Sequence, residues 1–213
     1  MLTPTKMRYD KAGPKVVEAL KKRHFDAWYF STREEAIEKV MSLIPAEDTV
    51  SWGGTMTVDE LGIKDLLRQR GQKLLDRDTA KTPDERMDLM RQSLTADTFL
   101  CSSNAITETG ELYNIDGNGN RVAAMIFGPK NVVLVAGMNK VVADMDAAYS
   151  MVRHNCAPAV VQRFPASKVP CNVTGECADC ISEESCCAYM VETRVCRPAG
   201  KIKVVLIGED LGL

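Results

Sequence analysis

Histidine and the common catalytic motifs are scarce in this chain of 213 residues. Only two histidines occur, His24 and His154, and each follows a stretch of helical spacing, where a cation favours the end of the helix dipole. The sequence has no GxGxxG turn, no phosphate-binding P-loop, no HExxH motif and no Ser-His-Asp order. These absences remove the usual support for a Rossmann dehydrogenase, a kinase, a zinc protease or a serine hydrolase.

Long apolar runs and an excess of one charge are also missing. No stretch reaches the roughly 18 apolar residues that a membrane-spanning helix needs, and the N-terminus has lysines without the apolar core of a signal peptide. The formal net charge is -2 and the 27 basic residues are scattered, so no footprint for nucleic acid or an anionic membrane surface is visible. We expect a cytoplasmic protein without a membrane span, whose partner is a small molecule or another protein.

Cysteine, in contrast, is abundant. The eight cysteines would suggest disulfides in a small secreted domain, but in a chain of this size without a signal peptide they indicate thiols that ligate or react. Six of them lie between residues 165 and 198, before the last predicted strand, in a segment without helical or strand period. Cys101 and Cys156 are predicted to be core residues, and the role of Cys196 stays open. We expect one domain over residues 1–213 with this cysteine-rich insertion.

The rest of the chain alternates between strand and helix patterns. Short apolar strands are predicted at 26–30, 49–52, 73–75, 98–101, 132–136 and 201–207. Helices are predicted over 9–23, 57–70, 83–94 and 141–153, with a further helix between a capping box at Ser31 and Pro45. This alternation is typical of an α/β fold with a mostly parallel sheet flanked by helices. Residues 106–115 predict an antiparallel hairpin inserted in that sheet, which would make it mixed.

The cysteine-rich insertion has a spacing suited to a metal centre. The pair Cys177 and Cys180 follows Cys171 and precedes the adjacent Cys186 and Cys187. Four thiolates of this set can converge, and thiolates bind iron–sulfur clusters or zinc. All-cysteine zinc sites usually contain two short-spaced pairs and this run has one, so the spacing favours a [4Fe-4S] cluster over zinc. A disulfide-laced loop and simply reduced, buried cysteines are the alternatives.

Two further segments predict a ligand site at the edge of the sheet. Gly53, Gly54 and Thr55 join a strand to a helix, where glycines allow close backbone approach and free N–H groups favour a phosphate or carboxylate. Glu108 stands between two threonines in a strand expected to be buried, which requires a ligand or a structural hydrogen bond. Arg121 is placed to meet an anion, with a surface salt bridge as the alternative. The expected ligand is a small carboxylate or a phosphorylated metabolite.

Four stretches carry a resemblance to a known family. They are SWGGT at 51–55, DELG at 59–62, AITETG at 105–110 and KIKVVLIGEDLG at 201–212. With them, nearly the whole chain resembles the LUD-domain family of lactate-utilisation proteins. Residues 170–180 are similar to a cysteine-rich tail found in one small-protein branch of that family.

The resemblance implies a fold similar to the NagB/RpiA/CoA-transferase superfamily, with a glycine turn and an acidic residue lining the ligand cleft. Seven residues match family positions: Gly53, Gly54 and Thr55 in the glycine turn, Glu60 in the next helix, and Glu108, Thr109 and Gly110 in the ETG strand. The branch's fourth cysteine corresponds to Cys187. The sequence EESCC at 183–187 departs from the branch's turn at this point, which leaves Cys186 as the alternative fourth ligand.

The sequence therefore supports one leading hypothesis and two alternatives. The first is a redox accessory protein of an L-lactate-oxidising system, in which the cluster carries electrons to or from other lactate-utilisation or redox proteins and the Gly/Thr/Glu cleft binds a small carboxylate. The second is an isomerase or transferase of a sugar phosphate or thioester, with Glu108 as catalytic base or nucleophile and a structural zinc site. The third is a non-catalytic sensor of a metabolite or of redox state.

Overall fold

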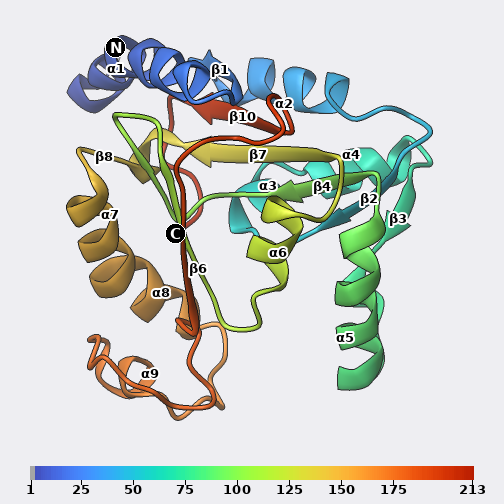
Figure 1. Ribbon diagram of the computed structural model, residues 1–213, viewed down its shortest axis with the longest axis vertical. Helices are drawn as coiled ribbons and strands as arrows, with labels where there is room; N and C mark the ends of the chain where they lie inside the picture. The colour runs from blue at the N-terminus through green and yellow to red at the C-terminus, as the bar shows by residue number, and fades with distance from the viewer. Residues whose placement is uncertain (1–2) are drawn as a thin grey trace.

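Six parallel strands form the central sheet of the computed structural model, which describes residues 3–213. In spatial order they are β1 (Asp26–Phe30), β10 (Ile202–Ile207), β7 (Asn131–Gly137), β4 (Thr98–Cys101), β2 (Thr49–Trp52) and β3 (Lys73–Leu75). Every neighbouring pair is parallel. The structure confirms the six predicted strands and the α/β class, with a mostly parallel sheet flanked by helices (Figure 1).

Six helices, one before β1 and the others between later strands, accompany this sheet and cover both of its faces. They are α1 (Pro4–Lys22), α2 (Arg33–Ser42), α3 (Met56–Glu60), α4 (Ile63–Gln69), α5 (Pro83–Gln92) and α6 (Asn120–Ile126). The first and last, α1 and α6, pack on one face, and α2, α3 and α4 pack on the other. The helix predicted over 57–70 is two helices, because Gly62 between them has a φ of 65°. The predicted capping box was wrong: α2 begins after Thr32, and the Ser31 hydroxyl donates to Asp10 instead.

A second, four-stranded sheet stands beside the first. Its order is β8 (Val141–Val142), β5 (Ala105–Thr107), β6 (Leu112–Asp116) and β9 (Tyr189–Thr193). β5 and β6 form the predicted hairpin, but the hairpin pairs with β8 and β9 and is not inserted in the main sheet. Mixed pairing therefore belongs to this second sheet. One face of the hairpin joins the main core through Ile106 and Leu112, while its other face packs on later helices.

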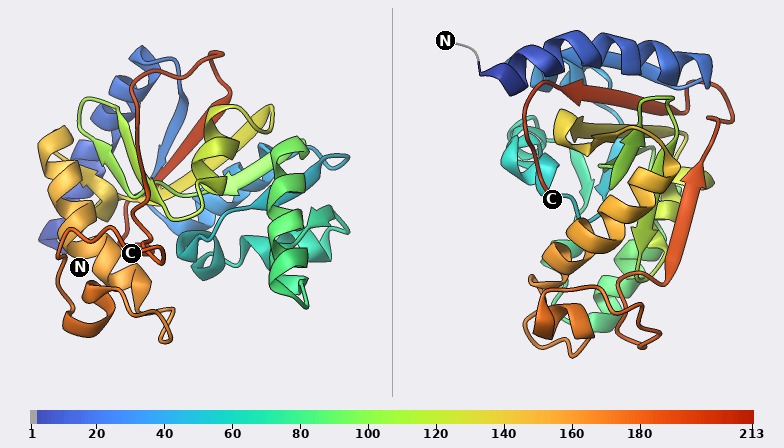
Figure 2. Two further views of the ribbon diagram at one scale, coloured as in Figure 1. Left: turned by 60° about the horizontal axis from the view of Figure 1, so that its bottom comes forward. Right: turned by 90° about the vertical axis from the view of Figure 1, so that its left-hand side faces the viewer.

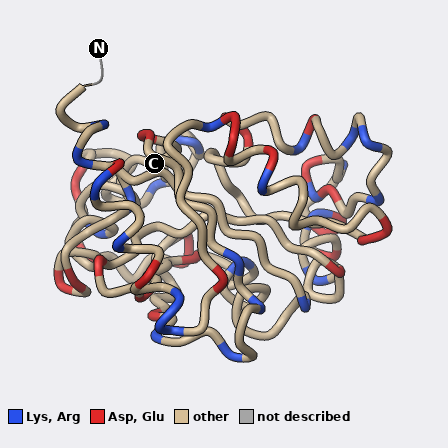
Figure 3. Tube along the Cα trace, turned by 90° about the horizontal axis from the view of Figure 1, so that it is seen from above, with Lys and Arg blue, Asp and Glu red and all other residues tan. Residues whose placement is uncertain are grey.

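Those later helices carry the cysteine-rich segment away from the main sheet, toward the bottom of Figure 1 and of the right-hand view in Figure 2. They are α7 (Met145–Met151), α8 (Ala157–Val161) and α9 (Pro170–Thr174), with a π-helical turn over Val152–Cys156 between the first two. Lys, Arg, Asp and Glu are interspersed along the whole trace (Figure 3). None of the helices within residues 3–213 combines the length and apolar character needed to cross a lipid bilayer.

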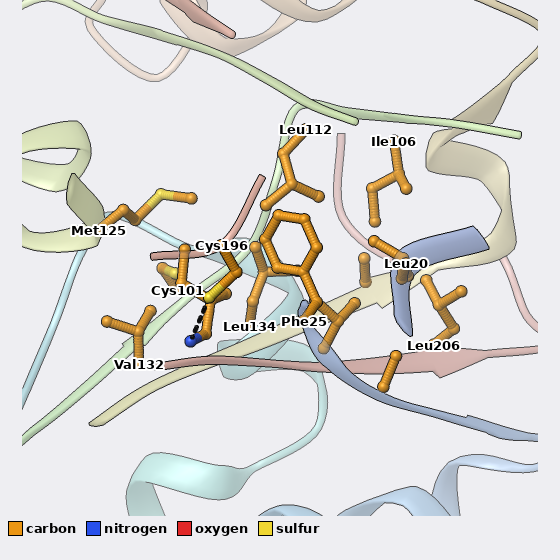
Figure 4. Close-up of a cluster of buried hydrophobic side chains, with 14 of the residues drawn as sticks. Leu20, Phe25, Cys101, Ile106, Leu112, Met125, Val132, Leu134, Cys196 and Leu206 are labelled. Atoms are coloured by element: carbon orange, nitrogen blue, oxygen red, sulfur yellow. Dashed lines mark hydrogen bonds between the residues drawn. The ribbon is translucent and has the colours of Figure 1, made fainter. Parts of the chain in front are cut away.

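Three cysteines belong to the hydrophobic core: Cys101, Cys156 and Cys196. Cys101 and Cys156 are buried, as predicted, and burial raises the pKa of Cys101 to about 12. Cys196 is buried as well, and its sulfur accepts a hydrogen bond from the backbone N–H of Ile202 (Figure 4). Figure 4 shows Cys101 and Cys196 among the apolar side chains on the α1 side of the main sheet. These three thiols serve packing.

The β5–β6 turn is fastened to α1 through Gly110, and this packing is testable. Gly110 has a φ of 89°, and a Cβ there would lie 2.7 Å from the backbone carbonyl carbon of Ala19. Gly110→Ala should therefore destabilise the protein by about 2 kcal/mol or more, measured by urea denaturation. Gly71→Ala is the control, because Gly71 has a φ of 73° with no atom within 4 Å and suffers only the backbone strain. Equal losses in both variants would contradict the close packing.

Candidate functional site

Five cysteines line one cavity, formed where α8 and α9 meet the loop before β9. The cavity measures about 190 Å³, and it is here named the cysteine cavity. All five predicted metal ligands line it: Cys171, Cys177, Cys180, Cys186 and Cys187. Gly175, with a φ of 79°, ends α9 and lets the chain turn back immediately after Cys171. This turn brings cysteines that are six and nine positions further along the chain to the same cavity.

The thiols of the cysteine cavity lie close enough to affect one another. The sulfur atoms of Cys186 and Cys187 are 3.7 Å apart. Burial raises the pKa of Cys171, and the neighbouring Cys180 and Cys187 raise it further. Across residues 3–213, no three Cys, His, Asp or Glu side chains are arranged so as to hold a metal ion. The structure thus brings the five cysteines to one cavity without drawing them around a single point.

Arg153 is a member of the cysteine cavity that no sequence motif indicated. Its Nε and Nη2 donate to the sulfur of Cys177 at 3.3 and 3.2 Å, and Nη2 also donates to Asp179. These bonds raise the pKa of Arg153, which therefore stays charged. A guanidinium stabilises negative charge on a neighbouring sulfur, and the thiolate is the form that binds metals. The π-helical turn that carries Arg153 is a rare geometry that recurs at functional sites, and residue periodicity does not reveal it.

A second cavity, of about 320 Å³, opens at the carboxyl ends of the main-sheet strands. Its wall includes Gly54 and Thr55 after β2, Arg77 after β3, Ser102 after β4 and Lys140 after β7, and it is here named the cationic cavity. β2 and β4 are neighbours in this sheet. The next strand of the sheet after β2 is β3, on one side of the pair, and the next after β4 is β7, on the other side, so the strand order reverses between β2 and β4. Open α/β sheets bind ligands at such a switch point.

The glycine turn makes room for arginine side chains. A Cβ at Gly53 would lie 3.1 Å from Cδ of Arg121, and a Cβ at Gly54 would lie 2.8 Å from Nη2 of Arg77. The backbone N–H of Gly53 already donates to the carbonyl of Leu100, and the Thr55 hydroxyl accepts from the backbone of α3. The turn therefore contributes to the cationic cavity mainly by admitting Arg77.

Arg121 is engaged entirely inside the protein. It is buried beside the glycine turn, and its ion pair with Asp116 has a nitrogen–oxygen distance of 2.7 Å. Its five N–H groups meet acceptors on neighbouring residues: Asp116, Asn114, Asn104, and the carbonyls of Ser102 and Ile115. No donor of Arg121 is left for a ligand. In this structure Arg121 links chain segments by hydrogen bonds inside the protein, and it makes neither an anion contact nor a surface salt bridge.

Glu108 and Thr109 lie outside the cationic cavity. Both are exposed in the β5–β6 turn, and Glu108 lines a shallow groove along α1. The expectation that Glu108 stands in a buried strand was wrong, because β5 ends at Thr107 and the chain turns there. The structure therefore does not bring Glu108 together with the glycine turn.

Two other glutamates make structural ties. Glu111, which no motif indicated, accepts hydrogen bonds from the hydroxyls of Thr107 and Thr109 and pairs with Arg23. Glu60, matched to the family's helix glutamate, accepts a hydrogen bond from the backbone N–H of Gly212 at 3.0 Å. The Glu60 contact holds the C-terminal segment against α3.

Two cations of the cationic cavity lack close partners among the described residues. Lys140 is 3% exposed, and within residues 3–213 its ammonium group has neither a hydrogen bond nor an ion pair. The buried Nε of Arg77 has no hydrogen-bond partner in the described chain, and its closest carboxylate oxygen, on Asp78, is 3.9 Å away. Burial lowers the pKa of both groups. The sequence did not mark either residue, since a single lysine or arginine after a strand has no recognisable spacing.

The fold and its two cavities define an α/β protein with a thiol-lined site next to a cationic one. The family model of the LUD domain matches residues 13–207, so the chain belongs to the LUD domain family. The structure is similar to the crystal structure of a DUF162 family protein from Deinococcus radiodurans, with a TM-score of 0.52 over 93% of this chain and 97% of that chain. The two are 12% identical, so this likeness shows the fold alone. No curated protein matches the chain.

The contrast between a partnered and an unpartnered buried arginine is testable. Arg121→Met should destabilise the protein by about 3 kcal/mol or more, because it leaves the buried Asp116 uncompensated. Arg77→Met should leave stability unchanged or raise it, because it removes a half-buried cation whose Nε is buried without a partner among the described residues. Urea denaturation of both variants measures the difference. A large loss in Arg77→Met would show that Arg77 is a structural residue and would contradict its assignment to a ligand site.

Proposed function

We propose that this LUD-domain protein is a redox accessory protein, in a family associated with lactate utilisation. In this proposal the cysteine cavity holds an iron–sulfur cluster of the [4Fe-4S] type, and the cationic cavity beside it binds a small carboxylate such as lactate. The convergence of five cysteines on one cavity is the observation that carries the proposal.

The cysteine cavity suits a cluster better than a single zinc ion. All-cysteine zinc sites usually combine two short-spaced cysteine pairs, and this cavity has one, Cys177 and Cys180. A cluster distributes its thiolate ligands over several iron atoms. When bound, the cluster would supply one-electron transfer.

The chain's own residues would have separate tasks around the cluster. Cys171, Cys177, Cys180 and Cys187 would be its ligands, with Cys186 as the alternative for the fourth position. Arg153 would donate hydrogen bonds to the sulfur of Cys177, and such bonds to ligand sulfur are one means of setting a reduction potential.

Cys186 supports a coupling between the two cavities, because it lines both of them. Its loop lies directly against Gly117, where a Cβ would be 3.2 Å from the carbonyl oxygen of Ser185 and 3.3 Å from Cα of Cys186. A ligand in the cationic cavity and the cluster would thus have Cys186 as a shared wall residue. This shared wall favours electron exchange between ligand and cluster. The isomerase alternative is disfavoured, because its catalytic residue would be Glu108, which lies outside the cationic cavity.

Metal content tests the proposal. Protein prepared without oxygen should contain iron and acid-labile sulfide at about four each per chain, with broad absorption near ~400 nm. Cys177→Ala should lose iron, sulfide and colour together. Cys101→Ala, which removes a thiol from the core instead, should keep all three. Stoichiometric zinc in place of iron, or an iron content that Cys177→Ala leaves unchanged, would contradict the cluster.

A further inference from the structure

The cationic cavity carries more positive charge than its own acidic residues neutralise. Six basic and three acidic side chains line it. Three of the basic residues each have an acidic partner: Arg86 with Asp78 at 3.0 Å, Lys64 with Asp59 at 2.7 Å, and Arg121 with Asp116 at 2.7 Å. Lys140, Arg77 and Arg163 remain, and among the described residues none of the three has a carboxylate within hydrogen-bond distance. Counted over side chains, the excess amounts to three positive charges, of which the one on Arg163 is exposed to solvent.

Two of these three cations, Lys140 and Arg77, lie in positions that are unfavourable for a charged group without a partner. Lys140 is almost fully buried, and the Nε of Arg77 is buried without a partner in the part of the chain described. An uncompensated buried cation is unfavourable, and such groups concentrate at binding sites. The glycine at position 54 leaves room for the guanidinium of Arg77, because a Cβ there would lie 2.8 Å from its Nη2 and the arginine would have to shift. Lys140 and Arg77 follow different strands, β7 and β3, so the charges reach the cavity from two sides.

The excess positive charge of the cationic cavity favours a phosphorylated ligand over a monocarboxylate. A monocarboxylate such as lactate has a single negative charge and would leave two cations uncompensated. A phosphate monoester carries about -1.5 to -2 at neutral pH and presents three strong acceptor oxygens. Arginine and lysine are the side chains that proteins use to bind such groups. A phosphate together with a carboxylate would therefore balance the three unpaired cations.

We propose that the ligand of the cationic cavity is a small phosphorylated carboxylic acid, held by its phosphate group at Lys140 and Arg77. The inference rests on the proposed ligand cavity and extends it by naming the phosphate. Buried hydroxyls add donors for the remaining oxygens, since Thr55 and Thr57 also line the cavity.

Calorimetric titration of the full chain tests this inference, with L-lactate, 2-phospho-L-lactate and inorganic phosphate as probes. The two acids differ only in the phosphate, which should tighten binding about tenfold or more. Lys140→Met and Arg77→Met should each weaken binding of phospholactate by about tenfold or more, since each removes one charged hydrogen-bond donor. Lys15→Met is the matched control, because Lys15 lies in the groove along α1 and outside the cavity. This control should bind like the wild type.

The outcomes separate this inference from the proposed function. Equal affinity for lactate and phospholactate would overturn the phosphate assignment and leave the carboxylate site standing. Phospholactate binding that Lys15→Met weakens as much as Lys140→Met would place the anion elsewhere and overturn the inference. Binding of none of the probes would overturn both the inference and the carboxylate site. None of these results bears on the cluster, which metal content measures independently.

Discussion

The buried ion pair between Arg121 and Asp116 is the interaction on which the rest of the site depends. Asp116 ends β6 of the second sheet, while Arg121 also donates to the carbonyl of Ser102, directly after β4 of the main sheet. The pair therefore joins the two sheets at the point where the cationic cavity opens. Its arginine also explains the glycine at position 53, and removing either partner would leave an uncompensated charge in the interior.

The Arg121–Asp116 pair lies next to the segments that form both cavities. The second sheet accepts β9 as its outer strand, and β9 continues directly from the cysteine loop. The loop in turn rests on Gly117, one residue beyond Asp116, so the Arg121–Asp116 pair also positions Cys186. The main sheet thus has the cationic cavity at its switch point, and the cysteine-rich insertion places the cysteine cavity next to it, with Cys186 in the wall of both.

Much of this arrangement was predictable from the sequence, and the parts that were not have physical reasons. The four central strands β2, β4, β7 and β10 were visible because both of their faces are buried, which requires continuous apolar runs. β9 was not visible, because it is an edge strand with an exposed face and is held by backbone pairing with β6. The cysteine spacing predicted a shared cavity from local geometry alone. The cations Lys140 and Arg77 were missed, because they come to one cavity only through the tertiary fold. Glu108 was favoured over Glu111 because a motif does not show where a strand ends.

In the proposed function, the cysteine segment binds an iron–sulfur cluster through its thiolates, next to the cationic cavity. X-ray absorption at the iron edge, recorded on anaerobically prepared wild-type protein and on Cys187→Ser, tests it most directly. We expect the wild type to show an all-sulfur first shell with neighbouring iron atoms, and Cys187→Ser to show an oxygen ligand in place of one sulfur or to lose the cluster. A first shell of oxygen and nitrogen atoms without an iron neighbour would contradict the claim.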